Sequence, residues 1–238
     1  MAIAITNTDS ECNFVKLLVY GDSGVGKTTL IKTAPKPIII STESGLLPLS
    51  GLNIPVIKVS TYEELCEAFE YVTDANNGHL FETICLDSIT DLAESILTAY
   101  KKEHRDPRAA YGKLNDDIAE IVRAFRDIET HHVYMTAKMN RVEDSNSGVA
   151  RYGATMPGRT LSQALPYFFD ECLYLAVAED DEGHSYRYFQ TQPSSTHTAK
   201  DRSGRLDNPE IPDLSVIIHK IIGKHNATIN TTAVEEEV

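Results

Sequence analysis

Apolar residues along this chain follow two alternating patterns. Short continuous apolar runs are typical of strands that are buried on both faces of a parallel sheet. These runs lie at residues 14–20, 37–41, 54–59, 81–87, 133–137 and 172–178, with a partner strand at 185–190. Segments with a helical spacing of apolar residues alternate with them, at 27–34, 61–74, 90–103, 118–128, 159–169 and 214–222. The alternation predicts an α/β fold with a mostly parallel central sheet, flanking helices on both faces and a C-terminal antiparallel hairpin.

Three polar stretches interrupt this pattern. Residues 104–113 form a polar break between two helices, whereas residues 139–157 have no periodicity and are rich in Ser, Asn and Gly. The second stretch is too long for an ordinary connection, which predicts a functional or mobile loop. Residues 224–238 are rich in Asn and Thr and contain a run of glutamates, so we expect a disordered acidic tail. With residues 1–12 as an N-terminal extension, we predict one domain over residues 13–223.

A phosphate-binding loop follows the first predicted strand. Its residues match the pattern G-x-x-x-x-G-K-T/S, and the strand before it and the helix after it supply the context that the motif requires. The glycines let successive N–H groups point at a β-phosphate, Lys27 reaches the β- and γ-phosphate oxygens, and the Thr28 hydroxyl binds Mg²⁺. The sequence therefore predicts an ATP–Mg²⁺ site, although no base-stacking residue separates ATP from GTP. The loop residues are Gly21, Asp22, Ser23, Gly24, Val25, Gly26, Lys27, Thr28 and Thr29.

Two acidic residues follow other predicted strands. Asp87 ends the apolar strand at 81–87 and is expected to support Mg²⁺ as a Walker B acid. The alternative is that it caps the next helix. Glu43 comes just after the strand at 37–41 and would lie near the γ-phosphate if that strand neighbours the phosphate-loop strand. A carboxylate there can orient an attacking water, and the alternative is an acid on a surface loop.

The bulk composition limits the class of protein. The net charge of −13 argues against a broadly basic surface that coats nucleic acid, although a few basic loops remain compatible with DNA binding. The four cysteines are scattered and form no C-x-x-C pair, which favours free thiols in a reducing compartment over a zinc site. No apolar run reaches the length of a membrane span, and the N-terminus lacks the features of a signal peptide. We therefore expect a cytoplasmic protein without membrane contact.

These motifs together resemble the RecA core, and most closely the short phage-encoded RecA-like ATPases of single-strand annealing and recombination. The resemblance covers about residues 13–222. The loop GDSGVGKTT is similar to RecA's GPESSGKTT, IIISTE to the family's F-I-D-A-E, and LDSITDL to V-D-S-V-A-A-L. The resemblance implies a RecA-like P-loop NTPase core with Glu43 as the catalytic carboxylate and Asp87 as the Walker B acid. Lys138 departs from the family, because RecA has a glutamine sensor at the end of that strand.

The same resemblance implies contacts with DNA and with a second subunit. Residues 104–113 and 139–157 fall where the family's two DNA-facing loops lie, and the alternative is solvated loop charge. Lys200 and Arg202 follow the hairpin as cations do in RecA-type filaments, where they reach a neighbour's γ-phosphate; the alternative is a basic surface turn. The candidate DNA-binding residues are Arg105, Arg108, Tyr111, Lys113, Arg141, Arg151 and Tyr152.

The resulting hypothesis is a DNA-dependent ATPase that binds single-stranded DNA and promotes annealing or strand pairing. It would assemble into a homo-oligomeric filament or ring, with a single-strand-binding protein as a candidate partner, in the host-cell cytoplasm if it is phage-encoded. Three alternatives remain: a RecA-fold DNA motor such as a helicase or packaging ATPase, a small-molecule kinase, and a nucleotide-gated adaptor. Glu43 argues against the adaptor, and the absence of an obvious arginine-bearing lid argues against the kinase.

Overall fold

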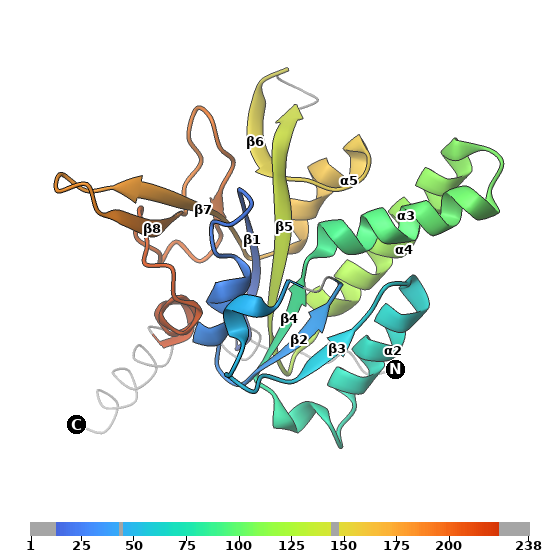
Figure 1. The fold of residues 1–238 in the computed structure, drawn as a ribbon, viewed down its shortest axis with the longest axis horizontal. Coiled ribbons are helices and arrows are strands. Elements are labelled where there is room, and N and C mark those ends of the chain that lie inside the picture. The colour runs from blue at the N-terminus through green and yellow to red at the C-terminus, as the bar shows by residue number, and fades with distance from the viewer. Residues whose placement is uncertain (1–12, 43–44, 144–147, 224–238) are drawn as a thin grey trace, which may run out of the picture.

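A nine-stranded sheet runs through the part of the chain that the structure describes. The computed structural model describes residues 13–42, 45–143 and 148–223. Seven strands follow the order β3-β2-β4-β5-β1-β7-β8, while β6 pairs with β5 and β9 pairs with β7 (Figure 1). The strands are β1 (Lys16–Gly21), β2 (Pro37–Ser41), β3 (Val56–Lys58), β4 (Thr83–Asp87), β5 (His132–Glu143), β6 (Ala150–Ala154), β7 (Glu171–Glu179), β8 (Ser185–Gln190) and β9 (Lys200–Asp201).

Helices connect most of these strands. A capping box between Thr61 and Glu64 starts α2. Among the described residues, no helix is long and apolar enough to cross a membrane. The α-helices are α2 (Tyr62–Thr73), α3 (Ile89–Glu103), α4 (Pro107–Arg126) and α5 (Arg159–Ala164), with a further helix at 214–223, and the 3₁₀ turns are η1 (Thr28–Thr33), η2 (Leu47–Leu49), η3 (Gly78–Leu80) and η4 (Leu165–Phe168).

The pairing confirms the predicted fold class. β1 is parallel to β5 and β7, and β4 is parallel to β2 and β5. Only the outer additions are antiparallel, namely β8 and β9 on β7 and β6 on β5. The chain is therefore an α/β protein with a mostly parallel central sheet and an antiparallel C-terminal hairpin.

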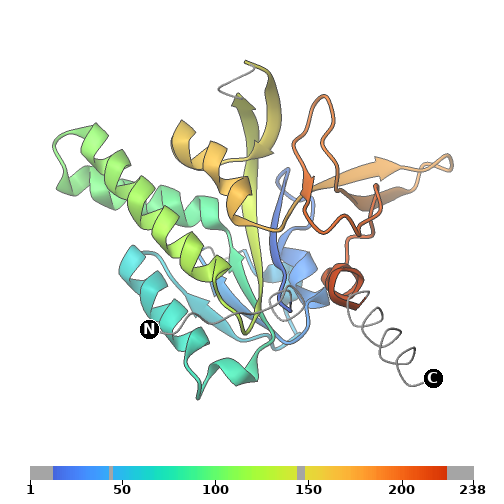
Figure 2. The same cartoon turned by 180° about the vertical axis from the view of Figure 1, so that it is seen from behind.

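Two apolar layers cover the sheet, because successive side chains of a strand point to opposite faces. From β1, Leu18 and Tyr20 pack under α2, α3, α4 and α5, whereas Leu17 and Val19 pack against η1 and the helix at 214–223. Figures 1 and 2 show these helices on opposite sides of the strands. The carboxyl ends of β1 and β4 remain uncovered by these layers, which leaves this edge of the sheet for a site.

The prediction of a loop over residues 104–113 is wrong. The chain breaks only at 104–106, and α4 begins at Pro107. Asp106 caps this helix by accepting a hydrogen bond from the Arg108 N–H (2.9 Å), and proline is favoured at the first helical position. The polar composition therefore marks a helix start and its solvent face, and it does not mark a loop.

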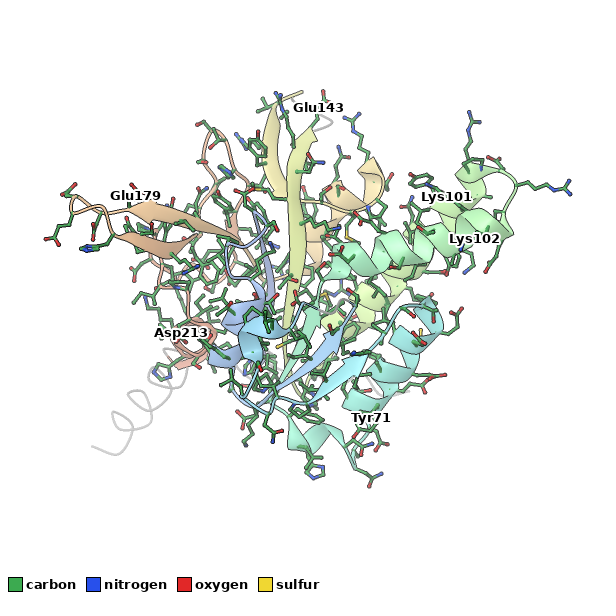
Figure 3. The ribbon with its side chains drawn as sticks, in the orientation of Figure 1. Tyr71, Lys101, Lys102, Glu143, Glu179 and Asp213 are labelled. Atoms are coloured by element: carbon green, nitrogen blue, oxygen red, sulfur yellow. The ribbon has the colours of Figure 1, made fainter. Side chains whose placement is uncertain are left out.

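The second predicted loop, over residues 139–157, is largely a hairpin. β5 continues past the sheet to Glu143 and pairs with β6, while residues 144–147 lie outside the described residues. Polar side chains are tolerated along both strands because the hairpin extends beyond the helical layers (Figure 1). Figure 3 shows Glu143 near its outer end.

Candidate nucleotide-binding site

The phosphate loop joins β1 to η1 and is shaped by two glycines. Gly24 (φ +78°) and Gly26 (φ +108°) have backbone angles that other residues rarely adopt. The Lys27 ammonium donates hydrogen bonds to the carbonyl oxygens of Gly21 (2.8 Å) and Asp22 (2.9 Å). The lysine side chain therefore lies across the loop and bonds to neutral acceptors. The phosphates of a nucleotide would offer it charged acceptors instead.

Asp87 lies beside the phosphate loop at the end of β4. The Thr28 hydroxyl donates a hydrogen bond to one carboxylate oxygen of Asp87 (2.6 Å), and the Thr136 hydroxyl donates to the other. The cap of α3 is Ser88, whose side chain accepts from the Asp91 N–H. The structure thus brings the predicted threonine and acid together and assigns the helix cap to the neighbouring residue.

A cavity of about 500 Å³ opens at this edge of the sheet, a size that accommodates a nucleotide. The phosphate loop forms one wall, and the ends of β2 and β4 together with the middle of β5 form the other. Two apolar side chains, Leu46 and Pro48, complete it. The lining residues are Gly21, Asp22, Ser23, Gly24, Gly26, Lys27, Thr28, Thr29, Ser41, Gly45, Leu46, Pro48, Asp87, Ser88, Asp91, Lys138 and Met139.

Lys138 lies in β5 directly beside Gly21 of β1. Its ammonium forms ion pairs with Asp91 (2.5 Å) and Glu94 (2.8 Å) of α3. The hydrogen bonds that its ammonium donates to these two carboxylates raise the pKa of Lys138 above its ordinary value, so the residue stays charged at neutral pH. The position of the expected sensor therefore holds a cation that links β5, the strand beside β1, to α3.

The oxygen atoms at Thr28 and Asp87 suit a magnesium ion. Within the described ranges, no group of three or more His, Cys, Asp and Glu side chains could hold a metal. Mg²⁺ does not require such a group, because it binds through one or two protein oxygens together with substrate phosphates and water. The hydroxyl of Thr28 and the carboxylate of Asp87, 2.6 Å apart, supply these oxygens.

Glu43 lies outside the described residues, but the strand before it can be placed. β2 pairs with β3 and β4 and does not neighbour β1, so the adjacency on which the placement of Glu43 depended is wrong. Its last residue, Ser41, lies opposite Asp87 and lines the same cavity as the phosphate loop. The chain therefore enters the segment that holds Glu43 from the wall of the nucleotide cavity.

Lys200 and Arg202 bond within their own chain. The Lys200 ammonium donates to the carbonyl oxygens of Phe169 (2.5 Å) and Pro166 (3.1 Å), and Arg202 pairs with Asp170 (2.9 Å). Burial lowers the pKa of Lys200, and the nearby Arg202 charge adds to this effect. Neither side chain lines the nucleotide cavity of this chain; Lys200 lines a second cavity together with Arg151.

Glu171, next to these cations, predicts a pH-dependent stability. Burial, with the adjacent Asp201 charge, raises the pKa of Glu171 to about 8 from 4.5. Between these two values the folded chain binds more protons than the unfolded chain, so stability falls as the pH rises. We expect Glu171→Gln to flatten this fall and to raise Tm by about 5 °C or more at about pH 9, but not at about pH 5.

Thermal unfolding across this pH range measures the effect. Glu179→Gln is the matched control, because Glu179 is an exposed carboxylate on the same strand (Figure 3). Equal pH slopes for Glu171→Gln and the wild type would show that Glu171 is ionised in the folded protein.

The first group of predicted DNA-binding residues lies at the α3–α4 end of the molecule. Arg105 and Arg108 are exposed there. Lys113 is engaged within the helix pair, because its ammonium bonds to Asp117 (2.6 Å) and to the Tyr100 hydroxyl (2.8 Å). Tyr111 is half-buried, with the Lys101 ammonium over its ring.

The second group gathers on the β5–β6 hairpin. Arg141 and Tyr152 lie opposite each other in the pairing of β5 with β6. Tyr152 is 45% exposed and stacks on His197, which stacks in turn on Tyr174 with a centroid distance of 4.0 Å. Arg151 precedes Tyr152 on β6, and its Nε is buried without a hydrogen-bond partner among the described residues. Arg141 and Tyr152 therefore share one face of the hairpin, whereas Arg151, opposite Val142, lines the second cavity on the other face.

Sequence reasoning missed three side chains that hold the site in place. The Tyr134 hydroxyl donates to the Lys27 carbonyl (2.8 Å), Thr136 donates to Asp87, and Arg187 Nε donates to the Val25 carbonyl (2.6 Å). The only available signal was strand alternation, which places residues 134 and 136 on one face of β5. Which face points to the loop depends on the strand order.

Two comparisons relate this chain to known sequences. A family model described as an AAA domain (AAA_24) matches residues 13–203, about four fifths of the chain. The chloroplastic phenylalanine–tRNA ligase beta subunit of Pyropia yezoensis is 27% identical over 99 residues, which are 42% of this chain and 13% of that protein. The second likeness thus spans a small part of a much longer protein, whereas the first includes the phosphate loop, Asp87 and Lys200.

Proposed function

We propose a finer function for this chain, which belongs to the AAA domain family. The protein is an ATP-dependent recombination protein that binds single-stranded DNA. The family makes the chain a P-loop NTPase, which binds and hydrolyses a nucleoside triphosphate, typically with Mg²⁺. One observation carries the finer proposal. β5 runs as a single strand from Lys138, beside the phosphate loop, to Arg141 on the hairpin that presents Tyr152.

Residues of the phosphate loop and of two strand ends would bind the nucleotide. The phosphate-loop N–H groups and Lys27 bind the phosphates, and Thr28 and Asp87 hold Mg²⁺, which neutralises charge between the β- and γ-phosphates when bound. Glu43 accepts a hydrogen bond from the attacking water and directs it at the γ-phosphorus. The placement of Ser41 on the cavity wall supports this last role.

Single-stranded DNA would bind on the β5–β6 hairpin. Arg141 and Arg151 bind backbone phosphates, and a base stacks on Tyr152, whose ring is braced by His197. Arg105 and Arg108 extend the contact at the α3–α4 end. The internal bonds of Lys113, and the partial burial of Tyr111, support a smaller contribution from these two residues.

Two cations follow the β7–β8 hairpin and would complete the site of a second subunit. Lys200 and Arg202 would act in trans, releasing their own-chain partners to stabilise charge on the γ-phosphate of a neighbouring subunit. The proposed assembly is a homo-oligomeric filament or ring, with annealing or strand pairing as its task and a single-strand-binding protein as a partner. Hydrolysis would then depend on assembly.

The experiment that tests this function measures ATP hydrolysis against protein concentration, with and without single-stranded DNA. We expect the rate per subunit to rise with concentration and single-stranded DNA to stimulate it by about tenfold or more. Tyr152→Ala should lose the stimulation and keep the basal rate. Tyr186→Ala is the matched control, because Tyr186 of β8 is similarly exposed (47%).

Two outcomes would contradict this proposal. Stimulation by duplex DNA, but not by single strands, would favour a DNA motor. Hydrolysis that neither DNA nor protein concentration changes would favour a monomeric kinase or adaptor.

A further inference from the structure

Arg187 lies against the phosphate loop although it belongs to β8, 162 residues further along the chain. Its Nε donates a hydrogen bond to the Val25 carbonyl oxygen (2.6 Å). A Cβ atom at Gly26 would meet this Nε at 3.1 Å and the Arg187 Cδ at 3.5 Å. The guanidinium group therefore packs directly on the backbone of the loop.

The contact is on the side of the loop that faces away from the nucleotide. Gly26 lines the nucleotide cavity, whereas Arg187 and Val25 do not. In a planar trans peptide the carbonyl and the N–H point in opposite directions. When Arg187 holds the Val25 carbonyl outward, the N–H of Gly26 in the same peptide is directed inward, to where a phosphate would lie.

The described residues place no carboxylate within ion-pair distance of Arg187. Here its Nε–H goes to a loop carbonyl. A hydrogen bond to that carbonyl polarises the peptide and strengthens its N–H as a donor.

We propose that Arg187 is a positioning residue of the phosphate loop, which fixes the Val25–Gly26 peptide so that its N–H points at the bound phosphates. The proposal rests on the nucleotide binding described above. The residue acts through the loop and does not touch the nucleotide.

Three substitutions separate the hydrogen bond from the charge. Arg187→Gln places an amide nitrogen at the position of the arginine Nε and removes the charge. Arg187→Lys keeps the charge but has a carbon at that position, and Arg187→Met has neither the donor nor the charge. We expect the KM for ATP to stay within about twofold for Gln and to rise about 3- to 10-fold for Met and Lys.

The expected pattern is a change in KM with an unchanged kcat, since the loop holds the phosphates equally in the ground and transition states. Binding of ADP should weaken by the same factor, and Tm without nucleotide should not follow this ranking. If lysine behaves like the wild type and glutamine like methionine, charge is what matters and the proposal is wrong. Equal KM values for all four proteins would also overturn it. A wild type that binds no ATP would instead refute the proposed function itself.

Discussion

Replacing Lys27 by alanine is expected to raise the dissociation constant for ATP by about 100-fold or more and to reduce hydrolysis to the background rate. The Lys27 ammonium reaches the carbonyl oxygens of Gly21 and Asp22 at the mouth of the loop. A bound triphosphate would replace these neutral acceptors by charged oxygens. Hydrogen bonds to charged groups contribute about 1.5–3 kcal/mol each, so two of them account for the expected loss.

Titration calorimetry with ATP and a phosphate-release assay measure the two effects of this substitution. Lys32→Ala is the matched control, because Lys32 is an exposed cation in the last turn of η1. Thermal unfolding without nucleotide separates lost affinity from a collapsed loop, since alanine also removes two bonds within the loop. Micromolar affinity retained by Lys27→Ala would refute the assignment of the phosphate loop.

The sequence predicts best those features that depend on neighbouring residues. The phosphate loop, the strand that ends at Asp87 and the capping box of α2 are each encoded within a few positions, and their local geometry follows from side-chain chemistry. The polar composition of residues 104–113 predicts a loop. The residues Asp106 and Pro107 are a strong helix-start signal, and the structure follows that signal. In a prediction, local signals can thus be present and still be outweighed by composition.

Features that depend on strand order could not be predicted in this way. The placement of Glu43 assumed that β2 neighbours β1, whereas β4 and β5 lie between them. The bonds from Thr136 to Asp87 and from Arg187 to Val25 join residues 49 and 162 positions apart. Nothing in a single sequence specifies such pairs, because they arise from the packing of the whole sheet.

Replacing Glu43 by glutamine is expected to leave ATP binding within about threefold of the wild type and to lower kcat by about 10²- to 10⁴-fold. Glutamine keeps the size of the side chain but loses the charge that orients and polarises an attacking water. Equilibrium binding and single-turnover hydrolysis measure the two quantities separately. Glu63→Gln, at an exposed position in the first turn of α2, controls for the loss of one negative charge. Wild-type turnover by the Glu43 variant would remove this residue from the mechanism.

The Glu43 variant also tests whether the site is shared between subunits. A Lys200→Ala subunit retains Glu43, and a Glu43→Gln subunit retains Lys200, so a mixed interface can contain one intact copy of each. If Lys200 acts in trans, mixing the two inactive proteins should restore part of the hydrolysis, because the lysine of one subunit then meets the glutamate of the next. Co-assembly without any rescue would instead assign Lys200 to its own chain, where its ammonium already holds the carbonyl oxygens of Phe169 and Pro166.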